Sequence, residues 1–227
     1  MKILASDFDL TLFVLDENVV AKNVSAIQKF ISAGNLFCII TGRSYSDIKV
    51  LLNQYQIPYS YLLCEDGAKI FNSVDYCIDT VMLDGDLVSK IISILEEDGW
   101  EYILDDGYNV TTNVSDCVKV FTEYQDREKA IMTVSKLKEK LDVFAYLSSS
   151  HINIISSSVN KANSLKKLLQ IEQISFPLYV IGDSVNDFEM IQEFDGVVMK
   201  NHSPVLDSLH KKEYEFLSDY IEELSKD

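Results

Sequence analysis

The chain has 227 residues, 47% hydrophobic and 25% charged, a composition typical of a globular protein with one large domain or two small ones. Its net charge of −16 argues against nucleic acid or an anionic membrane as a partner, so local cations must bind any anionic substrate. The four cysteines have no C-x-x-C spacing and the three histidines form no spaced pair, which argues against a disulfide framework and a zinc site. The apolar runs are too short for a signal peptide or a membrane span. We therefore expect a cytoplasmic protein.

The first part of the chain alternates between strand and helix patterns. Residues 2–6 and 36–40 are short apolar runs that predict buried strands, and apolar residues at helical spacing predict a helix over 23–33. A further helix to about residue 54 and a third strand at 61–64 continue the alternation. This order indicates βαβ units and therefore a parallel sheet with helices on both faces.

The pattern changes near residue 82, where the chain reads as helix, strand, strand, helix, strand, strand. Such an order suggests a small α+β layer in which helices cover one face of a sheet. The first pattern resumes after the serine-rich linker 156–158, with a helix from about Lys161 and a strand at 178–181. We predict an α/β protein whose discontinuous parallel-sheet core is interrupted by an inserted domain. The expected elements of the insert are 87–95, 101–104, 118–123, 127–140, 143–147 and 152–155.

Two carboxylates follow the first strand, two residues apart. Because side chains alternate along a strand, we expect Asp7, Asp9 and Thr11 to project into one small volume, although the chain turns there. Adjacent like charges are costly unless one is protonated or a cation lies between them, which suggests Mg²⁺-dependent chemistry at an aspartate nucleophile. The motif is weak by itself, since Asp84-Gly85-Asp86 has the same spacing and reads as a helix N-cap.

Three further polar segments stand at a strand end or a helix start, where open parallel sheets bind their ligands. They are Thr41–Arg43, Lys161 and Asp183–Asp187. The set suits phosphoryl transfer: Asp7 attacks, and Asp9 protonates the leaving oxygen and then deprotonates water. Asp183 would hold Mg²⁺ directly, and Asp187 directly or through water.

Thr41 is expected at a helix N-terminus, where free N–H groups and the helix dipole favour an anion. Gly42 would let the backbone approach it closely, and Lys161 would supply positive charge to a phosphoryl group. Each piece also has a plain structural reading, as a strand-to-helix turn, a solvated lysine or a cap, and Arg43 could pair with a surface carboxylate. Their joint occurrence in one order favours a site.

Four motifs and three further segments carry a resemblance to a known family. The motifs are Asp7–Thr11, Thr41–Arg43, Lys161 and Gly182–Asp187, and the segments are Glu65–Ala68, Phe188–Met190 and Val197–Asn201. In the four motifs the chain resembles the haloacid dehalogenase (HAD) superfamily of phosphatases, and in the three segments its Cof-type subfamily, with a type IIB cap. The resemblance covers essentially the whole chain. It implies a Rossmann-like core, residues 1–82 and 157–227, and an inserted cap, residues 83–156, that sets substrate specificity.

The resemblance also implies residue roles. Mg²⁺ would be bound by Asp7, the main-chain carbonyl of Asp9, Asp183 and Asp187. Phosphate or substrate would be contacted by Thr41, Gly42, Arg43, Asp66, Asn186 and Asn201.

Several residues depart from the family pattern, all of them around the substrate. Asp66 stands where the family has Asn, Ala162 replaces Gly after Lys161, and Asn201 has Lys200 and His202 as neighbours. The cap is also short, more like that of phosphoglycolate and sucrose-phosphate phosphatases. These departures leave the substrate open while the reaction type stands.

We expect a Mg²⁺-dependent phosphatase of a small phosphorylated metabolite, a sugar phosphate or a phospho-acid such as phosphoglycolate. The oligomeric state is not predicted. One alternative is a phosphomutase of the same fold, which a cap rich in clustered cations would favour. An alternative of another class is a phosphate-responsive, receiver-like binding module, which shares an Asp cluster, a Thr and a Lys.

Overall fold

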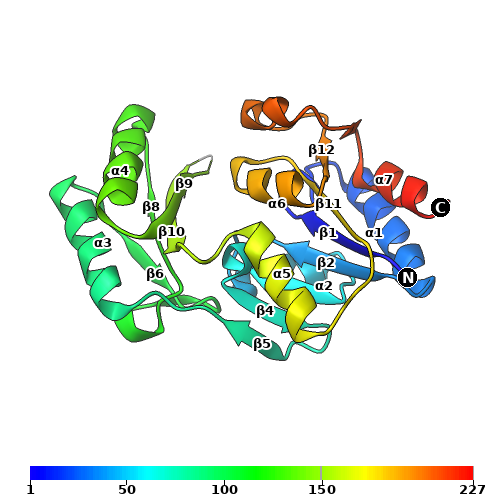
Figure 1. Cartoon of the computed structure of the whole chain (residues 1–227), viewed down its shortest axis with the longest axis horizontal. Helices are drawn as coiled ribbons and strands as arrows, with labels where there is room; N and C mark the ends of the chain where they lie inside the picture. The colour runs from blue at the N-terminus through cyan, green and yellow to red at the C-terminus, as the bar shows by residue number, and fades with distance from the viewer. Residues whose placement is uncertain (149, 227) are drawn as a thin grey trace.

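The computed structural model describes residues 1–148 and 150–226, in which two sheets lie side by side (Figure 1). The larger sheet contains β1 (Ile3–Asp7), β2 (Leu36–Ile40), β3 (Tyr61–Cys64), β4 (Lys69–Asn72), β5 (Cys77–Thr80), β11 (Leu178–Gly182), β12 (Val197–Met199) and β13 (Glu213–Tyr214). Its order is β13-β12-β11-β1-β2-β3-β4-β5, parallel from β13 to β3 and antiparallel at β4 and β5. The predicted parallel sheet is therefore present, with an antiparallel extension at one edge.

Helices cover both faces of the larger sheet, as the alternating strand and helix patterns predict. Alternate residues of β1 show the division: Leu4 packs on one side, and Ile3 and Ala5 on the other. One face carries α1 (Glu17–Ser32), α2 (Tyr45–Gln54) and α7 (Leu217–Leu224), and the other carries α5 (Lys161–Ile171) and α6 (Phe188–Glu193).

The smaller sheet, in the order β7-β6-β8-β10-β9, belongs to the cap. Helices α3 and α4 pack on one of its faces through a shared apolar core, and the opposite face is turned toward the larger sheet (Figure 1). The predicted helix-covered α+β layer is thus found, and we propose the division into residues 1–82 with 157–227 and 83–156 on this basis. The cap elements are α3 (Gly85–Glu97), β6 (Ile103–Asp105), β7 (Val110–Thr111), β8 (Lys119–Glu123), α4 (Arg127–Lys140), β9 (Val143–Leu147) and β10 (His151–Ser156).

The main errors in the predicted elements are local. Helix α1 begins at Glu17 instead of residue 23, because Asp16 caps it and accepts a hydrogen bond from the Asn18 N–H at 2.9 Å. Strand β6 begins at Ile103, two residues later than expected, and the short strands β7 and β13 are not predicted. None of the described helices has both the length and the apolar character that crossing a membrane would require.

Candidate active site

Three buried carboxylates meet at the carboxyl edge of the larger sheet. Asp7 ends β1, and Asp183 follows Gly182, the last residue of the neighbouring parallel strand β11. Asp187 lies one turn further on, in the 3₁₀ turn η3 (Val185–Asp187). One oxygen from each carboxylate lies within 4.8 Å of the others, and we call these residues the acidic group. The sequence prediction that Asp7, Asp183 and Asp187 belong together agrees with this arrangement.

Lys161 neutralises part of this charge. It is the first residue of α5 and is fully buried, and its Nζ lies 2.5 Å from Asp7 Oδ1 and 2.6 Å from Asp187 Oδ1. The preceding Asn160 is the N-cap of α5, because its side chain accepts a hydrogen bond from the Asn163 N–H at 2.8 Å. The cap fixes the start of the helix and with it the backbone from which Lys161 reaches the carboxylates.

Asp187 uses both of its oxygens within the protein. Its Oδ1 binds Lys161, and its Oδ2 accepts the backbone N–H groups of Asp183 at 2.9 Å and Ser184 at 2.8 Å. A Cβ at Gly182 would lie 2.4 Å from the Asp187 carboxyl carbon, so only glycine admits this approach. Asp187 therefore holds the backbone at Asp183 and Ser184 in place and also binds Lys161. Asp187 was predicted to contact Mg²⁺ directly or through water, and this geometry favours contact through water.

The acidic group is charged beyond what Lys161 can balance. Burial raises the pKa of Asp7 well above its ordinary value, Lys161 opposes this, and Asp187 and Asp183 add to it. Burial and Asp187 also raise the pKa of Asp183 to about 6, although its Oδ1 accepts a 2.6 Å hydrogen bond from the Thr11 hydroxyl. Apart from a contact between their own carboxyl groups, Asp7 and Asp183 each keep one oxygen to which no N–H or O–H among the described residues donates. Buried hard oxygen donors with unbalanced negative charge could hold a divalent cation.

Asp9 does not crowd Asp7 as the strand alternation predicts. Strand β1 ends at Asp7, and Leu10 has a left-handed φ of 61°, so the chain turns and the alternation stops. The Asp9 carboxylate lies at the edge of the site, half exposed, and accepts two 2.8 Å hydrogen bonds from Arg43. The like-charged neighbours of Asp7 are instead Asp183 and Asp187.

The loop Thr41–Arg43 directly follows β2, whose last residue Ile40 pairs with Asp7, and so it borders the acidic group. The Thr41 hydroxyl is buried and accepts the Arg43 N–H at 3.2 Å, while the Gly42 N–H has no acceptor among the described residues. The Arg43 guanidinium is bound to Asp9 and Asp47, which is the carboxylate pairing considered from the sequence.

The prediction that Thr41 lies at the N-terminus of a helix, where it would help to bind an anion, is wrong. Helix α2 begins only at Tyr45, and the backbone N–H groups of Tyr45 and Ser46 donate to the carbonyls of Gly107 and Tyr108 in the cap, at 2.9 and 3.1 Å. These two donors are therefore occupied by contacts with the cap and are not free for an anion.

Asp66 joins the core to the cap. It lies in the turn after β3 with a left-handed φ of 56° and is fully buried. Its Oδ2 accepts the hydroxyl of Tyr146, a residue of cap strand β9, at 2.5 Å, and its Oδ1 accepts the Asn186 amide at 2.7 Å. Both oxygens are thus engaged, and burial together with Asp66 raises the pKa of Tyr146.

Known proteins match this chain along most of its length. A family model described as haloacid dehalogenase-like hydrolase matches residues 4–116 and 101–215. The chain belongs to the haloacid dehalogenase-like hydrolase family. The predicted family, fold and enzyme class, a HAD-type phosphatase, are thereby confirmed.

Curated relatives of this HAD-family chain are named phosphatases. A 5-amino-6-(5-phospho-D-ribitylamino)uracil phosphatase, YwtE, of Bacillus subtilis (strain 168) is 25% identical, with 85% of each chain covered. An HMP-PP phosphatase of Yersinia enterocolitica is 22% identical, covering 90% of this chain and 86% of the relative.

Solved structures share the whole HAD fold, including the cap. A haloacid dehalogenase-like hydrolase from Bacteroides thetaiotaomicron superposes with a TM-score of 0.80 at 18% identity, covering 98% of this chain and 99% of the other. A HAD/COF-like hydrolase from Plasmodium vivax gives 0.84 at 19% identity over 99% and 95%. A HAD subclass IIB sugar phosphatase gives 0.78 at 14% identity over 99% of both chains, in agreement with the predicted type IIB cap.

One predicted site residue, Asn201, lies apart from the others. Asn201 lies exposed in the turn after β12, and its side chain makes no hydrogen bond within residues 1–148 and 150–226, although the nearby Ser203 N–H donates to the Asp183 carbonyl at 2.7 Å. Sequence reasoning missed the roles of Tyr146, Lys119 and Glu65, which connect the cap to the site. Strand alternation could have placed Lys119 and Tyr146 on the open face of the cap sheet, but not against the core.

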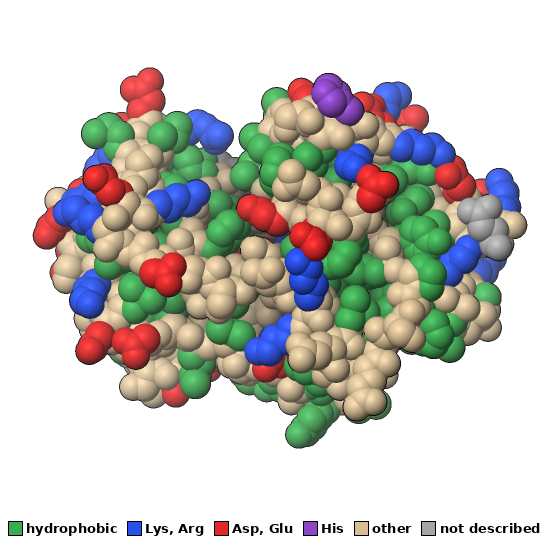
Figure 2. Space-filling model, in the orientation of Figure 1, with side chains coloured by type: hydrophobic (Ala, Val, Ile, Leu, Met, Phe, Trp, Pro, Cys, Tyr) green, Lys and Arg blue, Asp and Glu red, His purple; other side chains and the backbone are tan. Residues whose placement is uncertain are grey.

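Two lysines near the acidic group are hidden from solvent. On the face shown in Figure 2, acidic and basic side chains are interspersed over both the core and the cap. Lys161 and Lys119, by contrast, are 0% and 7% exposed. A phosphate group would therefore meet these two lysines only after entering between cap and core.

Proposed function

We propose that this protein is a Mg²⁺-dependent phosphatase that hydrolyses a small phosphomonoester through an aspartyl-phosphate on Asp7. The observation that carries the proposal is the bridge of buried Lys161 between Asp7 and Asp187, beside the open oxygens of Asp7 and Asp183. This arrangement offers a nucleophile, a fixed cation for phosphoryl oxygens and a place for a divalent ion within one small volume.

One carboxylate oxygen of Asp7 attacks phosphorus, and Lys161, which binds Oδ1, holds the carboxylate in place. The ester P–O bond then breaks, and Asp9, half exposed at the edge of the site, gives a proton to the leaving oxygen. Asp9 next takes a proton from the water that attacks the aspartyl-phosphate, which frees inorganic phosphate and restores Asp7. Arg43 binds both oxygens of Asp9, so one of these two hydrogen bonds must open when Asp9 carries the proton, while the other keeps Asp9 in position.

Mg²⁺ would be held by Asp7, Asp183 and the main-chain carbonyl of Asp9, with Asp187 acting through water. When bound, the ion would neutralise negative charge on the phosphoryl group. The set of oxygen donors suits Mg²⁺, which prefers one or two carboxylates and keeps several waters. The loop Thr41–Arg43 would contact the phosphate through the Gly42 N–H and the Thr41 hydroxyl.

For the substrate, we propose a small polar metabolite such as a sugar phosphate. Relatives are named for a ribitylaminouracil phosphate and for HMP-PP, and a structural neighbour is a sugar phosphatase. The cap lysine that contacts the loop Thr41–Arg43, Lys119, is paired with Glu65, so a carboxylate of a phospho-acid would compete with Glu65 for it. This favours a sugar phosphate over a phospho-acid such as phosphoglycolate.

The two alternatives receive less support. A phosphomutase must hold a second phosphate, yet Lys119 is bound to Glu65 and the cap's Lys136 to Glu97 and Asp98. A receiver-like module does not match a chain that belongs to a hydrolase family along its length.

The test is hydrolysis of p-nitrophenyl phosphate by the purified protein. We expect turnover with Mg²⁺, its loss with EDTA and its return on adding Mg²⁺. Asp7→Asn should abolish turnover, and Asp9→Asn should slow it or trap the intermediate. Wild-type turnover by Asp7→Asn would remove the nucleophile assignment, and a panel of phosphorylated metabolites would then decide the substrate of an active enzyme.

A further inference from the structure

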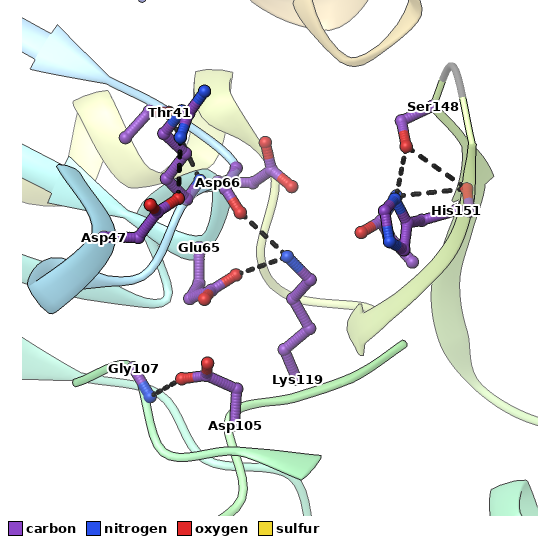
Figure 3. A network of polar contacts seen from close by, with 12 residues as sticks. Thr41, Asp47, Glu65, Asp66, Asp105, Gly107, Lys119, Ser148 and His151 are labelled. Atoms are coloured by element: carbon purple, nitrogen blue, oxygen red, sulfur yellow. Dashed lines mark hydrogen bonds and ion pairs between the residues drawn. The ribbon is translucent and has the colours of Figure 1, made fainter. Parts of the chain in front are cut away.

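A lysine of the cap reaches into the core beside the loop Thr41–Arg43 (Figure 3). Lys119 lies on β8, whose next residue Val120 packs in the cap core, so Lys119 points from the opposite face of the cap sheet. Its Nζ lies 2.8 Å from the Gly42 carbonyl oxygen and 2.7 Å from Glu65 Oε2. Both partners belong to the core, and the ion pair is buried, with 8% and 1% of the two side chains exposed.

The contact completes a set of three held carbonyls. The carbonyl oxygens of Thr41 and Arg43 accept backbone N–H groups of the core turn that follows β3, at 2.8 and 3.0 Å. The carbonyl between them, that of Gly42, is held by Lys119. The cap thus supplies the only side chain, among the described residues, that donates to a carbonyl of this loop.

The held carbonyl fixes the direction of a whole peptide group. The Gly42 C=O and the Arg43 N–H belong to one planar unit and point in opposite directions. The N–H end binds the Thr41 hydroxyl at 3.2 Å, so an anchor on the C=O end sets where that hydroxyl lies. Glycine imposes little restriction of its own on this peptide, which makes an outside anchor more important.

Resting on the proposed phosphatase function, we propose that Lys119 is a positioning residue of the closed cap. By binding the Gly42 carbonyl it orients the loop so that the Thr41 hydroxyl and the Gly42 N–H meet the phosphoryl group. The Lys119 ammonium group is already occupied by the Gly42 carbonyl and Glu65, so Lys119 acts on the loop and not as a substrate contact. Cap closure would then complete the phosphate site as well as cover it.

The chain offers a matched control at the same interface. Lys69 is also 7% exposed, and its Nζ donates across the interface to a backbone carbonyl, that of Asp106, at 2.6 Å. It does not touch the loop Thr41–Arg43. A variant at Lys69 therefore loses a lysine–carbonyl contact between cap and core without changing the anchor on Gly42.

The experiment compares Lys119→Gln with Lys69→Gln, using p-nitrophenyl phosphate as substrate and inorganic phosphate as inhibitor. Lys119→Gln is expected to lower kcat/KM and raise the inhibition constant of phosphate by about 10- to 100-fold. The Mg²⁺ concentration for half activation should stay within about twofold of wild type, because Lys119 does not touch the acidic group, whereas a general disturbance of the site would change it. Lys69→Gln should stay within about threefold on every measure.

Equal losses in both variants would mean that the contacts only close the cap, and an unchanged Lys119→Gln would mean that the loop needs no anchor; either result overturns the proposal. If Lys119→Gln does not fold because Glu65 is left buried and unpaired, the double variant Glu65→Gln/Lys119→Gln removes both charges and must show the same loss. If the wild type hydrolyses no phosphomonoester, the proposed function fails instead. The inference about Lys119 is then decided by direct calorimetric binding of inorganic phosphate to the same variants, with the same expected weakening.

Discussion

Three buried carboxylates share one buried lysine, and the excess negative charge falls on Asp7 and Asp183. A site built to hold a cation is expected to be strained without it, because like charges are kept together in a poorly solvated place. Asp183 shows this cost most simply. Its shape is preserved by asparagine, whose side-chain oxygen can still accept the hydrogen bond from the Thr11 hydroxyl.

Asp183→Asn should therefore raise stability while removing activity. Because the pKa of Asp183 is raised to about 6 in the folded protein, the unfolding free energy of the wild type should fall as pH rises from about 4 to 6. In EDTA at pH 8 we expect the variant to gain roughly 1–3 kcal/mol in unfolding free energy, and the gain should vanish below about pH 4. Urea unfolding across this pH range measures it.

The same variant should lose the response to metal. Mg²⁺ should raise the melting temperature of the wild type but not of Asp183→Asn, since a ligand that binds only the folded state stabilises it. The exposed Asp142→Asn should behave as wild type in both respects. A variant that loses stability in EDTA at pH 8 would contradict the account of charge repulsion.

At the scale of elements, the site depends on where strands end and helices begin. The core elements and the approximate positions of Asp7, Lys161 and Asp183 were predictable, because apolar runs and helical spacing are local signals. Asp9 was misplaced, because the turn at Leu10 interrupts the strand alternation. The contact of Tyr146 with Asp66 joins residues 80 positions apart, and no local pattern could reveal it. The same holds for the cap carbonyls that occupy the N-terminus of α2.

The start of α5 offers a test of one such element. Asn160→Ala removes the N-cap next to Lys161 and should cost about 1 kcal/mol of stability. It should also lower kcat several-fold, because the backbone that carries Lys161 is no longer fixed. Asp16→Ala removes the N-cap of α1 at a similar cost in stability, and there kcat should not change. Equal kcat in the two variants would show that the helix start does not position Lys161.

At the scale of the whole molecule, the closed arrangement depends on a few buried polar contacts between cap and core. They include an ion pair, and ion pairs of this kind gain little net stability, because removing two charges from water costs about as much as their attraction returns. Lys119 and Glu65 show the balance. Burial raises the pKa of Glu65 to about 7 even though Lys119 opposes the shift. The contact therefore fixes the position of the cap on the core more than it stabilises the protein.

This pair predicts a pH dependence of stability. The folded protein keeps a proton on Glu65 up to about pH 7, whereas the unfolded chain releases it near pH 4.5, so the unfolding free energy should fall as pH rises between these values. Glu65→Gln has no such proton to lose. Whatever its absolute stability, its unfolding free energy relative to wild type should improve by up to roughly 3 kcal/mol from pH 4.5 to 8. Glu97 is exposed and forms a surface ion pair with Lys136, and the variant Glu97→Gln should show no comparable trend. If the difference between wild type and Glu65→Gln is constant across this range, Glu65 is ionised throughout, and the cap is seated by a fixed ion pair.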